Sequence, residues 1–159
     1  MRAWANAGRW AMVLLRPGET PTAADRERYL EAAAAFELVA TPADTRAAFT
    51  AAVELWPGDS VALLGRGTAW YKSGDWHRAA DDYDAALAVD ANNVAAHNNL
   101  AMTKLLLGCP QSAQQQLANI KLDAISGALR EAVADTKAQI NAKREIPDHA
   151  SCAITAGWR

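Results

Sequence analysis

Apolar residues recur every three or four positions from residue 22 to about residue 143, which is the spacing of amphipathic helices. The clearest pair of helices lies within residues 59–93, where the turn Ser73-Gly74-Asp75 separates two short periodic runs. One hairpin of this length cannot bury its own apolar face. The pattern therefore predicts that further helical hairpins stack on this one.

The sequence repeats itself with a period of about 34 residues, a length typical of a helix–turn–helix unit. Shifting the chain by one period places residues 41–59 over residues 75–93, so that Phe49 aligns with Tyr83 and Ala52 with Ala86. We therefore predict an all-α array of three hairpins, at residues 26–59, 60–93 and 94–127. A helix at residues 128–145 is expected to cap the array, because its apolar residues lie on one side and its charges elsewhere.

Small residues are expected where the two helices of a hairpin cross, since only they let the backbones approach closely. Gly67 and Ala79 hold these positions in the second hairpin, with Trp70 and Tyr83 filling the space beside them. Lys104 stands in the third hairpin where the others have Phe36 and Trp70, as expected of a weakening terminal repeat. The predicted packing positions are Tyr29, Ala33, Phe36, Phe49, Ala52, Pro57, Leu63, Gly67, Trp70, Ala79, Tyr83, Ala86, Leu100, Ala101, Ala113 and Leu117.

The two ends of the chain do not follow the helical period. The apolar run at residues 10–15 is bounded by glycine and proline and predicts a short buried strand, followed by a proline-containing linker to residue 22. Thr22 and Asp25 have the spacing of a capping box and predict the start of the first helix. Residues 146–159 are predicted to form a loose tail.

The second hairpin resembles a tetratricopeptide repeat. The resemblance rests on Gly67, Trp70, Tyr71, Gly74, Asp75, Ala79, Tyr83, Ala86, Leu87 and Asp90, and in three copies it covers about residues 26–127. Departures from the family pattern are Arg66, Ala91 and Lys104. The resemblance implies a right-handed superhelix whose concave wall binds a peptide.

In that reading, four positions on the first helix of each repeat line the concave wall. They are Glu27, Leu30, Ala34 and Glu37, then Val61, Leu64, Thr68 and Tyr71, then Ala95, Asn98, Met102 and Leu105. The wall is apolar in its middle, which favours an apolar peptide or a helix segment. It lacks the basic set with which chaperone-binding members of the family hold an acidic C-terminus.

Two alternatives to a binding role stay open for these residues. For Leu64, Tyr71 and Leu105 the alternative is that they are packed by their neighbours or by the N-terminal strand. Asn98 and Asn99 either hold a peptide backbone through their amides or are ordinary first-turn helix residues.

A narrower resemblance joins the N-terminal stretch WANAGRWAMVLLRPGETP to the later ELWPGDSVALLGRGTAWY. Together they are similar to the C-terminal region of bacterial proteins that carry such repeats after a papain-like, bacteriocin-processing-type cysteine peptidase domain. The resemblance implies that residues 10–15 are the last strand of a peptidase sheet and that the chain is a fragment of a longer protein. No residue here matches the nucleophilic cysteine or its histidine, so peptidase activity is not carried over.

Composition narrows the possible partners. The chain has 159 residues, 51% of them hydrophobic and 21% charged, with a formal net charge of −2. This is a soluble globular composition without the basic field that collects nucleic acid or acidic lipid. No run reaches the ~18 apolar residues of a membrane span, and the N-terminus lacks the apolar centre of a signal peptide. We expect a cytoplasmic protein, or an exported one if the chain is a fragment.

The sequence offers few candidates for catalysis or metal binding. Cys109 precedes Pro110 at a predicted helix start and is expected to be a small capping residue rather than a nucleophile. His149 and Cys152 supply two potential ligands where a metal needs more. The acidic cluster Asp81, Asp82 and Asp84 is expected to be a solvated outer face. No catalytic residue, metal or cofactor is therefore predicted.

The favoured hypothesis is a non-catalytic protein-interaction module that binds a peptide or helix segment in its concave groove. One alternative is an accessory domain that captures or positions substrate for a cysteine peptidase. The other is a structural self-association module, in which two copies form a homodimer by pairing residues 10–15 edge to edge.

Overall fold

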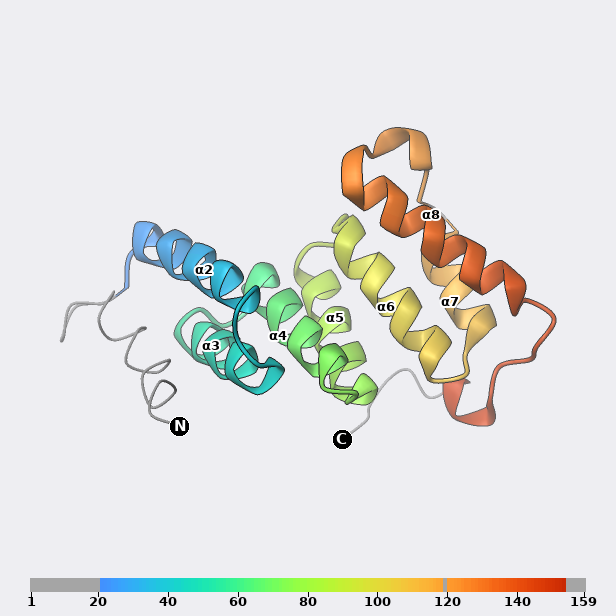
Figure 1. The fold of residues 1–159 in the computed structure, drawn as a ribbon, viewed down its shortest axis with the longest axis horizontal. Coiled ribbons are helices and arrows are strands. Elements are labelled where there is room, and N and C mark those ends of the chain that lie inside the picture. Colours follow the sequence, from blue (N-terminus) through green and yellow to red (C-terminus); the bar gives the residue numbers. More distant parts are fainter. Residues whose placement is uncertain (1–20, 119, 154–159) are drawn as a thin grey trace.

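The computed structural model describes residues 21–118 and 120–153, and the predicted strand at residues 10–15 lies outside them. The described chain is all-α, without a β-strand, and its helices follow one another in antiparallel hairpins (Figure 1). The elements are α2 (Ala23–Glu37), α3 (Pro42–Leu55), α4 (Ser60–Lys72), α5 (Trp76–Val89), α6 (Val94–Leu106), α7 (Pro110–Leu117), η1 (Leu122–Ala124), α8 (Gly127–Ala142) and η2 (Ala150–Ala153).

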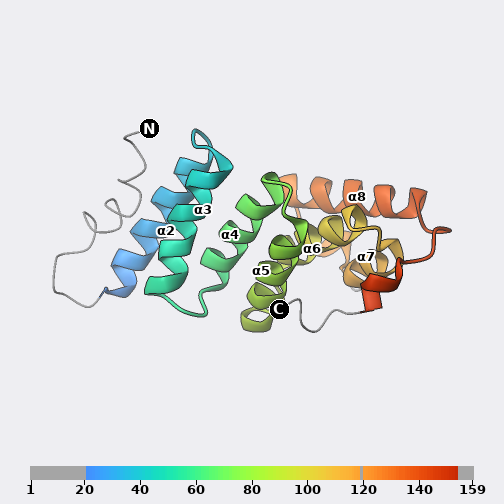
Figure 2. The same cartoon turned by 90° about the horizontal axis from the view of Figure 1, so that it is seen from below.

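The hairpins α2–α3, α4–α5 and α6–α7 lie side by side in chain order, and α8 closes the array by packing on α6 and α7 (Figures 1 and 2). Each helix packs against the next one along the chain, while α2 also meets α4 and α4 meets α6. The helices α2, α4 and α6 therefore form one layer, and α3, α5 and α7 form the other.

Local sequence signals set most helix boundaries. Thr22 and Asp25 form the predicted capping box at α2, and Thr41 caps α3 with Pro42 in its first turn. Asp59, Asp75 and Asn93 cap α4, α5 and α6 by accepting hydrogen bonds from backbone N–H groups. Gly74 follows the end of α4 with φ of 79°, and Gly108 follows the end of α6 with φ of 80°. This left-handed backbone conformation is unfavourable for residues that carry a Cβ atom.

Close helix crossing is observed where the sequence predicts it. Ala79 and Tyr83 of α5 are fully buried, and a Cβ on Gly67 would stand 2.8 Å from the Tyr83 ring. Gly65 plays the same part between the first two hairpins, because a Cβ there would overlap the ring of Phe49. The periodicity of the second hairpin identifies Gly67 but not Gly65, whose partner belongs to the preceding repeat.

Most of the predicted packing positions are buried in four apolar clusters. Phe36 and Trp70 are half-buried at the edges of these clusters, while Pro57 is exposed in the α3–α4 turn. In the first cluster the hydroxyl of Tyr29 donates to the carbonyl of Ala48 at 2.8 Å. The buried phenol therefore has a partner, as burial of a polar group requires.

A charged pair explains the departure at Arg66. Its guanidinium donates two hydrogen bonds to Asp82, with Nε to Oδ2 at 2.8 Å and an Nη atom to Oδ1 at 2.6 Å. Asp82 is only 6% exposed and faces α4. The expectation that the acidic cluster is a solvated outer face is therefore wrong for Asp82, although Asp81 and Asp84 are exposed.

The indole of Trp70 links the first two hairpins in a similar way. The guanidinium carbon of Arg46 lies 4.3 Å from the ring centroid, and that of Arg78 lies 4.7 Å from it. Both distances are within the range of cation–π attraction. Trp70 therefore contributes to contacts between neighbouring hairpins as well as within its own.

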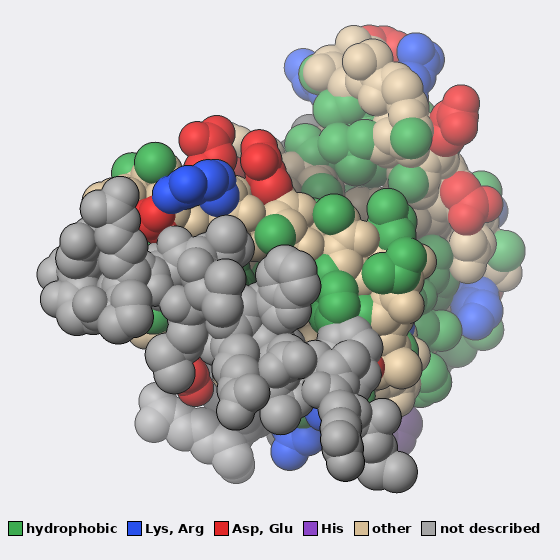
Figure 3. Space-filling model, turned by 60° about the vertical axis from the view of Figure 1, so that its left-hand side comes forward, with side chains coloured by type: hydrophobic (Ala, Val, Ile, Leu, Met, Phe, Trp, Pro, Cys, Tyr) green, Lys and Arg blue, Asp and Glu red, His purple; other side chains and the backbone are tan. Residues whose placement is uncertain are grey.

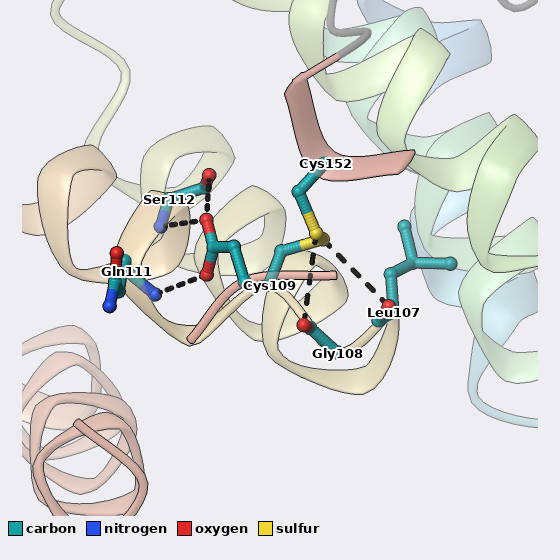
Figure 4. Close-up of a disulfide and its surroundings, with 7 residues drawn as sticks. Leu107, Gly108, Cys109, Gln111, Ser112 and Cys152 are labelled. Atoms are coloured by element: carbon teal, nitrogen blue, oxygen red, sulfur yellow. Dashed lines mark hydrogen bonds between the residues drawn. A yellow bond between two sulfur atoms is a disulfide. The ribbon is translucent and has the colours of Figure 1, made fainter. Parts of the chain in front are cut away.

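The tail is not loose over its described part. A disulfide joins Cys152 to Cys109, with Cα atoms 5.7 Å apart, and the carboxylate of Asp148 accepts hydrogen bonds from the backbone N–H groups of Gln111 and Ser112 at 2.7 and 3.0 Å (Figure 4). Asp148 thus caps α7, whose own N-cap residue Cys109 offers no side-chain hydrogen bond. Neither contact follows from local sequence patterns, because the partners lie far apart in the chain.

We expect Gly67→Leu to lower the free energy of unfolding by roughly 1–3 kcal/mol, because the added side chain must displace the Tyr83 ring. Urea denaturation followed by circular dichroism measures the change. Ala85→Leu on the exposed side of α5 is the control and should stay within about 0.5 kcal/mol of the parent. Equal stability of Gly67→Leu and the parent would contradict the close crossing.

Replacing both cysteines with serine should destabilise the protein by up to about 4 kcal/mol, because the disulfide closes a loop with a sequence separation of 43 residues. Urea denaturation of the parent with and without reductant, beside the double variant, measures the effect. The reduced parent should match the variant. Two titratable thiols in the unreduced, denatured protein would refute the disulfide.

Candidate functional site

The candidate site is the inner face of the layer formed by α2, α4 and α6. Hydrophobic side chains gather in the hollow below the projecting start of α8 in the view of Figure 3. The middle helix, α4, presents Leu64, Thr68 and Tyr71 along one face, each of them half-buried. Val61, one turn earlier, is 45% exposed. These side chains offer apolar surface while remaining anchored in the core.

Leu64 and Tyr71 are held in place by the layer beneath them. Both pack against the buried cluster that contains Tyr83 and Leu100. The hydroxyl of Thr68 donates to the carbonyl of Leu64 at 2.9 Å and accepts from the hydroxyl of Tyr83 at 3.4 Å. The face of α4 is therefore preorganised, which lowers the entropy lost when a ligand binds.

On α2, the predicted groove residues have different roles. Leu30 is buried in the first core cluster at 7% exposure, so it supports the wall rather than lining it. Glu37 accepts a hydrogen bond from Lys72 of α4 at 2.6 Å and closes that end of the face with an ion pair. Glu27 and Ala34 are exposed.

On α6, Met102 is half-buried and packs on the cluster that contains Leu117 and Ile140. Leu105 is buried at 5% exposure, so packing by its neighbours is the correct reading for this residue. Ala95 is half-buried at the start of the helix. The predicted groove surface, called here the α4–α6 face, keeps Val61, Leu64, Thr68, Tyr71, Asn98 and Met102. Leu64 and Tyr71 pack on one buried cluster, whereas Met102 packs on another.

Asn98 is the unusual residue of the α4–α6 face. Its side chain is buried, at 8% exposure for the residue, and its Oδ1 atom has no hydrogen-bond partner among the described residues. A buried acceptor left without a donor costs about 1–3 kcal/mol. Such a group in a native protein calls for an explanation, and a donor supplied by a ligand is one.

Burial raises the pKa of the Tyr71 phenol, and burial raises that of Tyr83 to about 12. Both phenols are therefore protonated near neutral pH. Tyr71 on the α4–α6 face and Tyr83 on α5 are therefore neutral hydrogen-bonding groups.

The described residues offer little for catalysis. No group of three or more His, Cys, Asp or Glu side chains lies together as metal ligands would in this part of the chain. The sulfur of Cys109 is bonded to Cys152 and cannot act as a thiolate nucleophile in this state. No helix in residues 21–118 or 120–153 is long and apolar enough to cross a membrane.

Comparison with solved structures identifies the TPR domain of Sgt2 from Aspergillus fumigatus as similar. The TM-score is 0.64 at 20% sequence identity, over 79% of this chain and 85% of that chain. No family model matches the sequence, and no curated protein matches it at a significant level. At this identity the likeness shows the fold alone, which is a tetratricopeptide-type superhelix.

We expect Asn98→Leu to leave the free energy of unfolding unchanged or slightly higher, because the substitution removes a buried acceptor without a donor and adds apolar contact. The control is Asn93→Leu, which removes a helix cap on the same helix and should lose about 1 kcal/mol. Chemical denaturation of both variants tests the difference. A loss at position 98 as large as that at position 93 would show that the Asn98 amide is satisfied within the fold.

Proposed function

We propose that this protein is a non-catalytic protein-interaction module that binds a peptide or a helix segment on the α4–α6 face. The observation that carries the proposal is the combination of half-exposed apolar side chains, Leu64, Tyr71 and Met102, with the unpartnered acceptor of Asn98. A tetratricopeptide-type fold is in general a protein-binding scaffold, and its curved inner layer presents an extended surface.

The side chains of the α4–α6 face indicate which kind of peptide it would bind. An aromatic ring, a branched aliphatic group and a flexible thioether accept apolar side chains of varied shape. The Asn98 amide supplies an acceptor for a backbone N–H group, once a small rotation brings its Oδ1 out of the wall. Lys72, at the edge of the face, is already paired with Glu37. An apolar segment is therefore favoured over an acidic tail.

The other two hypotheses gain no support from the described residues. An accessory role beside a cysteine peptidase depends on a domain outside this sequence. Self-association through residues 10–15 depends on a segment outside the described part of the chain. Neither hypothesis is supported by a structural feature of the described residues comparable to the α4–α6 face.

The proposal is tested with peptides selected from a random display library on the intact protein and then measured by isothermal titration calorimetry. Tyr71→Ala and Met102→Ala should each weaken binding at least tenfold, because each removes apolar surface that the peptide covers. Asp81→Ala, an exposed change on α5, is the control and should leave affinity unchanged. Circular dichroism confirms that each variant is folded.

Selected peptides that bind the Tyr71, Met102 and Asp81 variants equally well would place recognition elsewhere on the molecule. A library that yields no binder to the folded parent would also count against the proposal.

A further inference from the structure

A second hollow lies beside α6, on a different face of that helix from the α4–α6 face. Its volume is about 860 Å³, and it is bounded by the α5–α6 turn, α6, α7 and the segment that follows α7. His97 and Lys104 are seven residues apart on α6 and share one face of that helix. The groove residues Asn98 and Met102 lie about a third of a turn away, so the two surfaces are separate.

The charged side chains that line this hollow are basic, and the carboxylate of Asp148 lies beside the lining residue Ser112, from whose backbone N–H and hydroxyl it accepts hydrogen bonds. Its charged lining residues are Lys104 and Lys121, and no Asp or Glu lines it among the described residues. The neutral side chains of Asn92, Gln115 and Gln116 add amide groups beside the two ammonium groups. The lining therefore favours an anion.

A chain of hydrogen bonds fixes Lys104 in this wall. Its Nζ donates to Oε1 of Gln116 at 2.9 Å, and because an ammonium group can only donate, this bond sets the orientation of the amide. Nε2 of Gln116 then faces Nδ1 of His97 at 2.6 Å, so Nδ1 accepts. The other ring nitrogen of His97 donates to the carbonyl of Ala91 at 3.0 Å.

Among the described residues, no carboxylate lies within salt-bridge distance of the Lys104 ammonium, although Asp84 and Asp148 act on it electrostatically. The ammonium is half-buried, and burial lowers its pKa while Asp84 and Asp148 oppose that shift from a distance. Among the described residues the ammonium donates one hydrogen bond, to Gln116, which leaves two N–H groups for a ligand. Equivalent positions in the other hairpins hold Phe36 and Trp70, so the lysine departs from what packing alone favours.

We infer that this hollow binds a carboxylate, carried either by a small organic acid or by an acidic side chain of a bound protein. The carboxylate is held between the ammonium groups of Lys104 and Lys121 and accepts further hydrogen bonds from the neighbouring amides. A phosphate is disfavoured, because the nearby helix N-terminus of α7 already donates its backbone N–H groups to Asp148.

The test uses the intact protein labelled with ¹⁵N and titrated with three probes: glutarate, acetyl-Glu-Glu-amide and inorganic phosphate. Saturable shifts of the His97 and Gln116 signals with glutarate support a small-acid site, and shifts with the dipeptide alone support an acidic side chain of a protein. Lys104→Met should lower the affinity for the carboxylate probe at least tenfold. Lys143 is exposed at the end of α8, and Lys143→Met should leave that affinity unchanged.

Tyr71→Ala should keep the carboxylate site intact, which separates failure of this inference from failure of the peptide-binding proposal. Three results would overturn the inference. These are the absence of saturable shifts with either carboxylate, tighter binding of phosphate than of both carboxylates, and equal effects of Lys104→Met and Lys143→Met.

Discussion

The close approach of neighbouring helices at positions without bulky side chains is the constraint on which the structure depends. Gly67 lets the Tyr83 ring lie against the backbone of α4, and Gly65 does the same for Phe49 of the preceding hairpin. Each large ring fills the space left by a missing side chain, so the helices pack closely at these two positions. The same stacking aligns α2, α4 and α6 in one layer, so that side chains from separate repeats form a shared surface.

The layer of α2, α4 and α6 combines side chains held firmly by the core with polar groups that lack a hydrogen-bond donor or an ion-pair partner among the described residues. Leu64 and Tyr71 are anchored by the buried cluster around Tyr83, yet part of each stays accessible. Asn98 carries a buried acceptor without a partner in the described chain, and Lys104 holds a half-buried charge without an ion pair. Both depart from what stability alone favours, and such departures are concentrated at functional positions. They lie on different faces of α6, and on each face we propose a recognition surface.

The repeat architecture was predictable because its causes are local or periodic. Capping residues such as Thr22 and Asp75, and the recurrence of Phe49 at Tyr83, indicate helices and their stacking directly. Contacts between distant segments give no such signal: the Cys109–Cys152 bond and the cap supplied by Asp148 depend on how the tail folds back. The division of groove residues into buried Leu30 and Leu105 and accessible Val61 likewise depends on neighbouring side chains rather than on helical position.

The contact between Gly67 and Tyr83 can be observed directly by nuclear magnetic resonance. We predict strong nuclear Overhauser effects between the Gly67 Hα protons and the ring protons of Tyr83, with an Hα resonance displaced by the ring current. This result would show that α4 and α5 approach each other as closely as the stacking of the hairpins requires. Normal Hα shifts without any effect to the Tyr83 ring would contradict the account, since the hairpins would then pack by some other contact.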